Sequence, residues 1–152
     1  MSDSSPLEMR ELTQADVDLL CDLNHQLQVD EGSAPMTIPQ LRDRLQQWLA
    51  EDSDAMGFYR NDRLLGYALW QRPYIDTANR PCVYLRQLFV QRDCRRLGYG
   101  QTIFQLLQDR VWPAGVNILL QVMVSNASGR QFWQSLGVEE VGINCVLPGK
   151  QP

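Results

Sequence analysis

A strand that runs at once into a glycine-rich basic turn and then a helix constrains this chain more than any other feature. Residues 82–101 read CVYLRQLFVQRDCRRLGYGQ. The first half is rich in β-branched, aromatic and other apolar residues, as a buried strand is. Beyond the turn, Ile103, Phe104, Leu107 and Val111 recur at helical spacing. The stretch therefore predicts a central strand, a tight turn and a helix in direct succession.

The composition of the turn indicates an anion site. Gly98 and Gly100 allow backbone conformations that a Cβ disfavours, and they let a ligand approach closely. Backbone N–H groups at a helix start have no partner within the helix, and together with the helix dipole they favour phosphate. Arg95 and Arg96 add positive charge. The alternative is an ordinary turn with solvated arginines. The Rossmann fingerprint is absent because Ile103 stands where it needs a third glycine, and no Gly-Lys-Ser/Thr closes a P-loop.

A second motif follows about one strand later, and the two together resemble a known family. Residues 126–138 read NASGRQFWQSLGV, which is similar to the Asn-x-x-Ala-x-x-Phe-Tyr-x-x-x-Gly-Phe segment of the GNAT acyltransferases. Arg95-x-x-Gly98-x-Gly100, after a strand that ends in residues 88–90, resembles motif A of that family, Gln/Arg-x-x-Gly-x-Gly/Ala. The chain is therefore identified as resembling the GNAT superfamily of acetyl-CoA-dependent N-acetyltransferases.

The resemblance implies where acetyl-CoA would bind as a co-substrate. Leu88 and Val90 would offer backbone groups to the pantetheine arm, residues 95–101 would surround the pyrophosphate, and the Asn126 side chain would contact the pantetheine. From its residue type alone, Asn126 suits a helix N-cap equally well. The cofactor-binding residues implied in this way are Leu88, Phe89, Val90, Arg95, Arg96, Leu97, Gly98, Tyr99, Gly100, Gln101, Asn126, Phe132 and Trp133.

The pattern of the whole chain predicts an α+β fold. With 152 residues, 44% of them hydrophobic and 21% charged, we expect one domain over 1–152, with loose tails at 1–6 and 148–152. Strands are expected at 9–12, 55–60, 64–71, 82–90, 117–124 and 138–147. Helices are expected after the capping residues Thr13 and Thr37, after the glycine turn, and over 127–136. Gly66 within a strand predicts a bulge or a close backbone approach. The GNAT resemblance implies a mixed central sheet of about six to seven strands, flanked by about four helices, with two central strands splayed apart.

The catalytic positions are where the sequence departs from the family. Tyr84 stands where many members have a glutamate base, and Trp133 stands where many have a tyrosine acid. A phenol with a pKa near ~10 is a poor base at neutral pH, and an indole cannot serve as an acid. Asp30 and Glu31, between the first two helices, are the candidate substitutes, with Tyr84 or His25 acting through water as further options. The alternative is a solvated acidic loop.

Two other residues leave alternatives open. Arg86, on the motif strand, could bind a carboxylate of the acceptor, or it could pair with Asp30 or Glu31. Cys94 lies beside two arginines that could lower its pKa and make the thiol reactive, whereas Cys82 and Cys145 lie in apolar runs and are expected in the core.

The favoured function is transfer of an acetyl group from acetyl-CoA to a primary amine of a small molecule or peptide, directly within a ternary complex. The alternative is an acyl-CoA-binding regulatory module with little turnover. The net charge of −4 weighs against nucleic acid as a partner. No apolar run is long enough to span a membrane, and His25 has no partner at metal-ligand spacing. Without an export signal, a cytoplasmic location is expected. The GNAT resemblance also allows a homodimer.

Overall fold

The computed structural model of the protein describes residues 5–32 and 34–152. Within them the chain forms five strands and four α-helices, an α+β arrangement with a mixed sheet. The chain divides into two compact units, residues 1–121 and residues 122–152. The first unit contains the whole sheet and three of the helices, and the second contains one helix.

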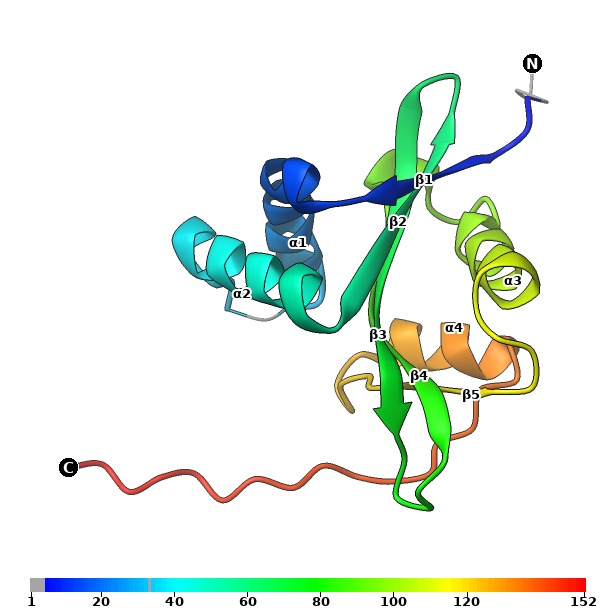
Figure 1. The fold of residues 1–152 in the computed structure, drawn as a ribbon. Helices are drawn as coiled ribbons and strands as arrows, with labels where there is room; N and C mark the ends of the chain where they lie inside the picture. Colours follow the sequence, from blue (N-terminus) through cyan, green and yellow to red (C-terminus); the bar gives the residue numbers. More distant parts are fainter. Residues whose placement is uncertain (1–4, 33) are drawn as a thin grey trace. The chain divides into compact units, whose positions relative to one another are not determined.

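The sheet of the first unit has the strand order β1-β2-β3-β4-β5. Neighbouring strands are antiparallel except β4 and β5, which are parallel, as the expected strand–helix–strand crossover requires. Helices α1 and α2 lie on one face of the sheet, and α3 lies on the other (Figure 1). The bounds are β1 Glu8–Leu12, α1 Val17–Asp30, α2 Ile38–Glu51, β2 Ser53–Arg60, β3 Arg63–Ile75, β4 Pro81–Val90, α3 Tyr99–Arg110 and β5 Asn117–Leu120.

Local capping chemistry starts the first two helical segments where the sequence predicts. The Thr37 hydroxyl accepts a hydrogen bond from the backbone N–H of Gln40, and the Gln40 side chain accepts one from the N–H of Thr37. Thr13 and Asp16 form the same reciprocal box ahead of α1. Each box satisfies backbone donors that a helix start leaves without partners.

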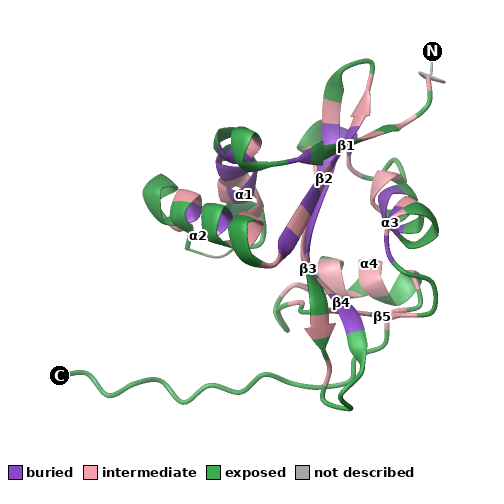
Figure 2. Ribbon diagram, in the orientation of Figure 1, coloured by how far each residue is buried: buried purple, intermediate pink, exposed green. Residues whose placement is uncertain are grey.

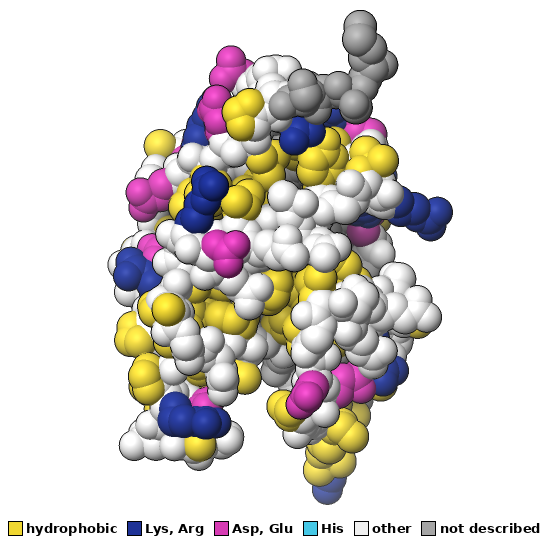
Figure 3. Space-filling model, turned by 90° about the vertical axis from the view of Figure 1, so that its right-hand side faces the viewer, with side chains coloured by type: hydrophobic (Ala, Val, Ile, Leu, Met, Phe, Trp, Pro, Cys, Tyr) yellow, Lys and Arg dark blue, Asp and Glu magenta, His cyan; other side chains and the backbone are white. Residues whose placement is uncertain are grey.

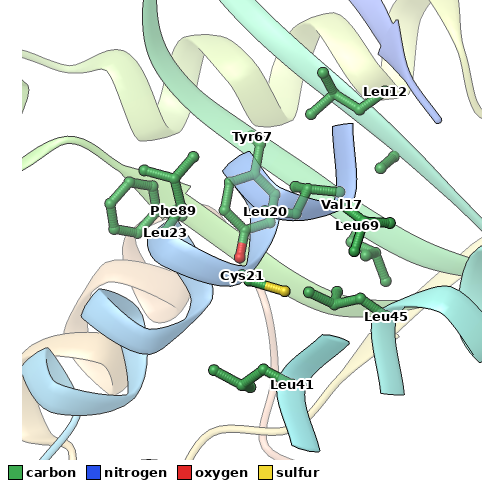
Figure 4. Close-up of a cluster of buried hydrophobic side chains, with 11 residues drawn as sticks. Leu12, Val17, Leu20, Cys21, Leu23, Leu41, Leu45, Tyr67, Leu69 and Phe89 are labelled. Carbon is green, nitrogen blue, oxygen red and sulfur yellow. The ribbon is translucent and has the colours of Figure 1, made fainter. Parts of the chain in front are cut away.

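The core is divided between the two faces of the sheet. On the α1–α2 face, Leu20, Leu41 and Leu45 pack toward Tyr67 and Leu69 of β3 (Figure 4). Buried residues are concentrated on the strands and on the inward helix faces (Figure 2). The α3 face is closed by a second apolar group, in which the Trp112 ring meets the rings of Trp70 and Phe104 edge-on; its main members are Trp70, Ile103, Phe104, Leu107 and Trp112.

Three expectations about the C-terminal part are wrong. β5 ends at Leu120 instead of Val124, and residues 138–147 form no strand, so the sheet has five strands where six to seven were expected. The alternating Val141 and Leu147 are 84% and 93% exposed, and Cys145, expected in the core, is also exposed. In the described part of the chain no strand pairs with this segment, and an extended segment without a partner gains no ladder hydrogen bonds. Within the second unit, the regular element is α4, Ala127–Ser135.

The surface gives two further observations. No helix in the described ranges combines the length and the apolar character needed to cross a bilayer. On the face drawn in Figure 3, basic and acidic side chains are interspersed instead of gathering in a patch of one sign.

Candidate functional site

A β-bulge in β4 marks the place where β4 and β5 part. Leu69 of β3 pairs with Gln87, and the next residue, Trp70, pairs with Leu85, which leaves Arg86 as an extra residue in β4. The last pair between β4 and β5 is also at Leu85. Beyond this level β4 keeps β3 on one side, and no strand in the described residues occupies the other side. The splay expected of the two central strands therefore begins at the bulge.

The open edge of β4 presents backbone groups of Leu88 and Val90. The N–H of Gln91 donates to the carbonyl of Leu65 in β3 at 2.8 Å. Since bonding to one neighbour alternates along an antiparallel strand, the groups of Leu88 and Val90 point to the open side. The Val90 carbonyl already accepts a hydrogen bond from Nε of Arg95 at 2.8 Å. Both N–H groups and the Leu88 carbonyl remain for a ligand.

The start of α3 is the place where the sequence predicts an anion site. Gly98 precedes the helix with φ 83°, and Arg96 has φ 63°, so the chain enters the helix through left-handed conformations. Among the residues that the structure describes, no side chain caps this helix. The first backbone bond to a residue of the helix runs from Thr102 N–H to the Gly98 carbonyl at 3.1 Å. The N–H groups of residues 99–101 therefore face outward at the positive end of the helix dipole.

The side chain of Arg95 braces this turn from within the first unit. Its Nη2 donates to Oδ2 of Asp30 at 2.6 Å, while Nε of Arg92 donates to Oδ1 of the same carboxylate at 3.0 Å. Burial raises the pKa of the Asp30 carboxyl, but the bonds and charges of the two arginines outweigh it, so the net pKa is lowered. Asp30 is thus a poor proton acceptor, and it ties the end of α1 to the turn.

Glu31 has the opposite electrostatic environment. Glu31 is exposed, but partial desolvation of its carboxyl raises the pKa, and the negative charge of Asp30 raises it further. In the part of the chain that the structure describes, no arginine or lysine pairs with it. A raised pKa makes a carboxylate the stronger base of two, so the electrostatic surroundings distinguish the two neighbouring candidates.

Tyr84 lies on β4, half-buried, with its ring centroid 5.1 Å from that of Tyr74. Burial raises the pKa of the Tyr84 phenol; the charge of Arg86 acts against this, and Tyr74 adds to it. The side chain is therefore a hydrogen-bond donor at neutral pH, and it lacks the charge that a base in this position would carry.

A buried polar chain on the α1–α2 face was not predicted from the sequence. Nη2 of Arg44 donates to Oδ1 of Asn24 at 3.1 Å, and Nδ2 of Asn24 donates to the Tyr67 hydroxyl at 3.5 Å. That hydroxyl donates to Oε1 of Gln87 at 2.8 Å. Burial strongly raises the pKa of Tyr67, which keeps the phenol neutral. The chain links α2, α1 and β3 to the bulge, and an asparagine on an otherwise apolar helix face was its only signal.

Arg86 occupies the bulge and turns toward α2. Its guanidinium donates to Oγ of Ser53 at 3.2 Å and to Oε1 of Gln71 at 2.7 Å. It lies over the Trp48 ring at 4.4 Å and 3.7 Å from Asp52. The expectation that it could pair with a carboxylate of the α1–α2 loop is therefore wrong.

Three of the predicted site residues, Asn126, Phe132 and Trp133, belong to the second unit. Oδ1 of Asn126 accepts a hydrogen bond from the N–H of Gly129 at 3.0 Å, so Asn126 is the N-cap of α4. The rings of Phe132 and Trp133 meet edge-on at 4.9 Å. Contacts of these three residues with acetyl-CoA stay predictions.

The Tyr99 hydroxyl accepts a hydrogen bond from Nη1 of Arg60 at 2.7 Å, which fixes its ring at the start of α3. A cavity of about 450 Å³ in the first unit is lined by Trp70, Val83, Trp112 and their neighbours, and it includes no residue from 86 to 101. The open edge, which has the free backbone donors, is the better match for a chain-like anionic ligand. Within residues 5–32 and 34–152, no cluster of three or more His, Cys, Asp or Glu side chains could hold a metal ion.

Comparisons with known proteins agree with this geometry. The family model described as the acetyltransferase (GNAT) family matches residues 20–138. A possible acetyltransferase from Clostridium difficile 630 superposes with a TM-score of 0.77 at 16% identity, covering 96% of this chain and 99% of the other. A predicted acetyltransferase from Clostridium acetobutylicum, solved with acetyl-CoA, gives 0.75 at 16%, covering 94% and 96%. A ribosomal-protein-alanine N-acetyltransferase from Brucella melitensis gives 0.65 at 12%, covering 95% and 100%. No curated protein sequence matches.

Proposed function

Because the chain belongs to the acetyltransferase (GNAT) family, we propose that it is an N-acetyltransferase that moves the acetyl group of acetyl-CoA to a primary amine of a small molecule or peptide. The observation that carries the proposal is the open edge of β4 next to the uncapped start of α3. A pantetheine arm can bond to such an edge as an added strand would. A pyrophosphate suits the free N–H groups beside it.

Acetyl-CoA supplies the acetyl group in activated form, as a thioester. The free N–H of Leu88 or Val90 would donate to the carbonyl oxygen, where negative charge develops during transfer. The N–H groups of residues 99–101 would hold the phosphates, with the exposed Arg96 adding charge. The side chain of Arg95 is engaged by Asp30 and Val90, so its contribution is to shape the turn.

The proton of the amine has an acceptor in Glu31, directly or through one water, because the raised pKa of Glu31 makes it the better base of the acidic pair. The departing thiolate needs little help, since a thiol has a pKa near ~8.5. The properties of the Cys94 side chain support direct transfer of the acetyl group, without an acyl-enzyme intermediate. Burial raises the pKa of its thiol, and its hydrogen bond to Asp93 raises it further, so it is a weak nucleophile.

The test combines cofactor binding with amine-dependent release of free thiol. The protein is mixed with acetyl-CoA and a panel of polyamines, amino acids, aminoglycosides and peptides, and the CoA thiol is followed. We expect release that requires an amine. Glu31→Gln should lower kcat by about 10²–10⁴-fold and leave the Kd for CoA unchanged. Glu51→Gln, an exposed residue at the end of α2, is the matched control and should change neither quantity.

The alternative function, an acyl-CoA-binding regulatory module, is favoured by one observation, the absence of a charged base at Tyr84. It makes a different prediction in the same experiment. CoA would bind with a measurable Kd, and no amine in the panel would release thiol above the rate in buffer. That result would refute the transferase.

A further inference from the structure

We propose that the acceptor carries a carboxylate as well as its amine, and that Arg44 and Arg86 bind this carboxylate beside Trp48. The inference rests on the proposed transferase function, because it names the class of amine that the same site takes. It predicts amino acids or similar amino-carboxylates as acceptors.

Two guanidinium groups from different elements meet at one indole ring. Cζ of Arg44, on α2, lies 4.6 Å from the centroid of the Trp48 ring, and Cζ of Arg86, in the β4 bulge, lies 4.4 Å from it. Burial lowers the pKa of Arg44, and the charge of Arg86 lowers it further. Like charges in a half-buried position are unfavourable unless an anion neutralises them.

The protein supplies little of the neutralising charge itself. Among the residues the structure describes, no carboxylate pairs with Arg44, whose Nε is buried without a hydrogen-bond partner. Asp52 lies 3.7 Å from Arg86, and the close partners of Arg86 are the neutral Ser53 and Gln71.

Several arginines elsewhere on the chain have close acidic partners. Arg42 pairs with Asp18 and Arg72 pairs with Asp54. Among the described side chains, the two guanidinium groups at Trp48 share one nearby carboxylate, that of Asp52 at 3.7 Å from Arg86. A further planar carboxylate would fit a guanidinium fork through two parallel bonds.

Arg86 of the arginine pair lies on the same strand as the open edge where we propose that acetyl transfer takes place. Arg86 is two residues before Leu88, and a strand rises about 3.3 Å per residue, so the two lie roughly 7 Å apart along β4. Glu31 is the C-cap of α1, and Asn24 of the same helix donates to the Tyr67 hydroxyl. Tyr67 in turn bonds to Gln87, the neighbour of Arg86. The guanidinium of Arg86 itself reaches Ser53 and Gln71, and in our proposal an acceptor held there directs its amine toward Glu31 and the open edge.

The charges also exclude a class of acceptor. A polyamine without a carboxylate would bring positive charge to two arginines that have too little neutralising charge already. Such amines should bind weakly here, whereas amino-carboxylates gain two charge-assisted contacts.

The first arm of the test compares each of the twenty amino acids with its carboxamide, by thiol release. The acids should be the better substrates. Arg86→Gln and Arg44→Gln should each raise KM for an acid by about 10–100-fold, the loss of one charged hydrogen-bonded contact, and change KM for the amide far less. Arg42→Gln is the control, because Arg42 lies on α2 like Arg44 but pairs with Asp18. It should change neither the KM for the acid nor the KM for the amide. Arg86→Lys keeps the charge without the fork and should give an intermediate KM, which guards against a variant that merely misfolds.

The second arm needs no turnover. The complex of the protein with CoA is titrated calorimetrically with N-acetylated amino acids and with their amides. Binding of the acids that is lost in Arg86→Gln supports the carboxylate site even where no amine releases thiol, and in that case the transferase alone fails. Equal use or equal binding of acids and amides, or a preference for polyamines, overturns the carboxylate site and leaves the transferase standing.

Discussion

Replacing Gly66 with alanine should push β4 away from β3 at the level of the proposed cofactor edge. A Cβ at Gly66 would lie 2.3 Å from the carbonyl oxygen of Phe89 and 3.2 Å from Cδ1 of Ile103. Carbon–oxygen contacts in sheets lie at about 3.3 Å or more. The carbonyl must therefore retreat by roughly 1 Å, and it is backbone, which cannot swing aside as a long side chain does. Gly66 pairs with Val90, so the displaced segment is the one that carries the free N–H groups.

The expected loss of stability follows from this collision. Adding a methyl group to a packed core costs about 1–3 kcal/mol, and a backbone obstacle places Gly66→Ala in the upper half of that range. For a chain of this size each kcal/mol lowers Tm by about 2–4 °C. Urea unfolding should show a lower midpoint with an unchanged m-value, and the Kd for CoA should rise. Gly142→Ala is the matched control, because its Cβ meets nothing within 4 Å. If the two variants unfold at the same urea midpoint, Gly66 does not lie as close to the Phe89 carbonyl as the structure indicates.

Three further changes test separate contacts. Asn126→Ala should destabilise α4 by about 1 kcal/mol, measured by helicity and unfolding, and Asn126→Asp should retain the cap. Asp30→Asn should lower stability by less than about 1 kcal/mol, because Arg92 is 57% exposed. Since the folded pKa of Asp30 is lowered, the difference should be present above the unfolded pKa of about 3.9 and vanish as pH falls through the folded value; a difference that persists there contradicts the ion pairs. The raised pKa of Glu31 places the acidic limb of kcat/KM above pH ~4.3, and Glu31→Gln should remove that limb.

Features that depend on neighbouring residues were predictable from the sequence. Residues only a few positions apart determine the capping boxes at Thr13 and Thr37 and the turn at Gly98. The structure has each of them where the pattern indicates. Gly66 was expected to mark a bulge or a close backbone approach, and both are confirmed: the β2–β3 register shifts beside Gly66, and Phe89 lies close to it. The parallel β4–α3–β5 unit follows from the same logic, because a strand, a helix and a strand in succession leave few ways to close.

Features that depend on distant partners were not predictable. Arg95 and Arg96, just before the glycines of the turn, indicate a phosphate-binding site. The side chain of Arg95 nevertheless bonds to Asp30, which lies 65 residues earlier. The alternation of Val141, Ile143 and Leu147 is typical of a strand, but a strand also needs a neighbour to pair with, and periodicity does not say whether there is one. The buried link between Asn24 and Tyr67 likewise joins two segments whose meeting only the fold decides.

The bulge explains why both halves of the proposed site fall on one strand. In a regular strand, consecutive side chains point to opposite faces. Here Arg86 contacts Trp48 of α2, and Gln87 bonds to Tyr67 of the α1–α2 core, so both face the same side. One extra residue thus places two polar side chains together on the acceptor side. It also returns β4 to its pairing with β3 in the register that turns the backbone of Leu88 toward the open edge. Tyr84 lies before this shift and is neutral at physiological pH, and we therefore propose Glu31 of the α1–α2 loop, not a residue of the strand, as the base for the amine.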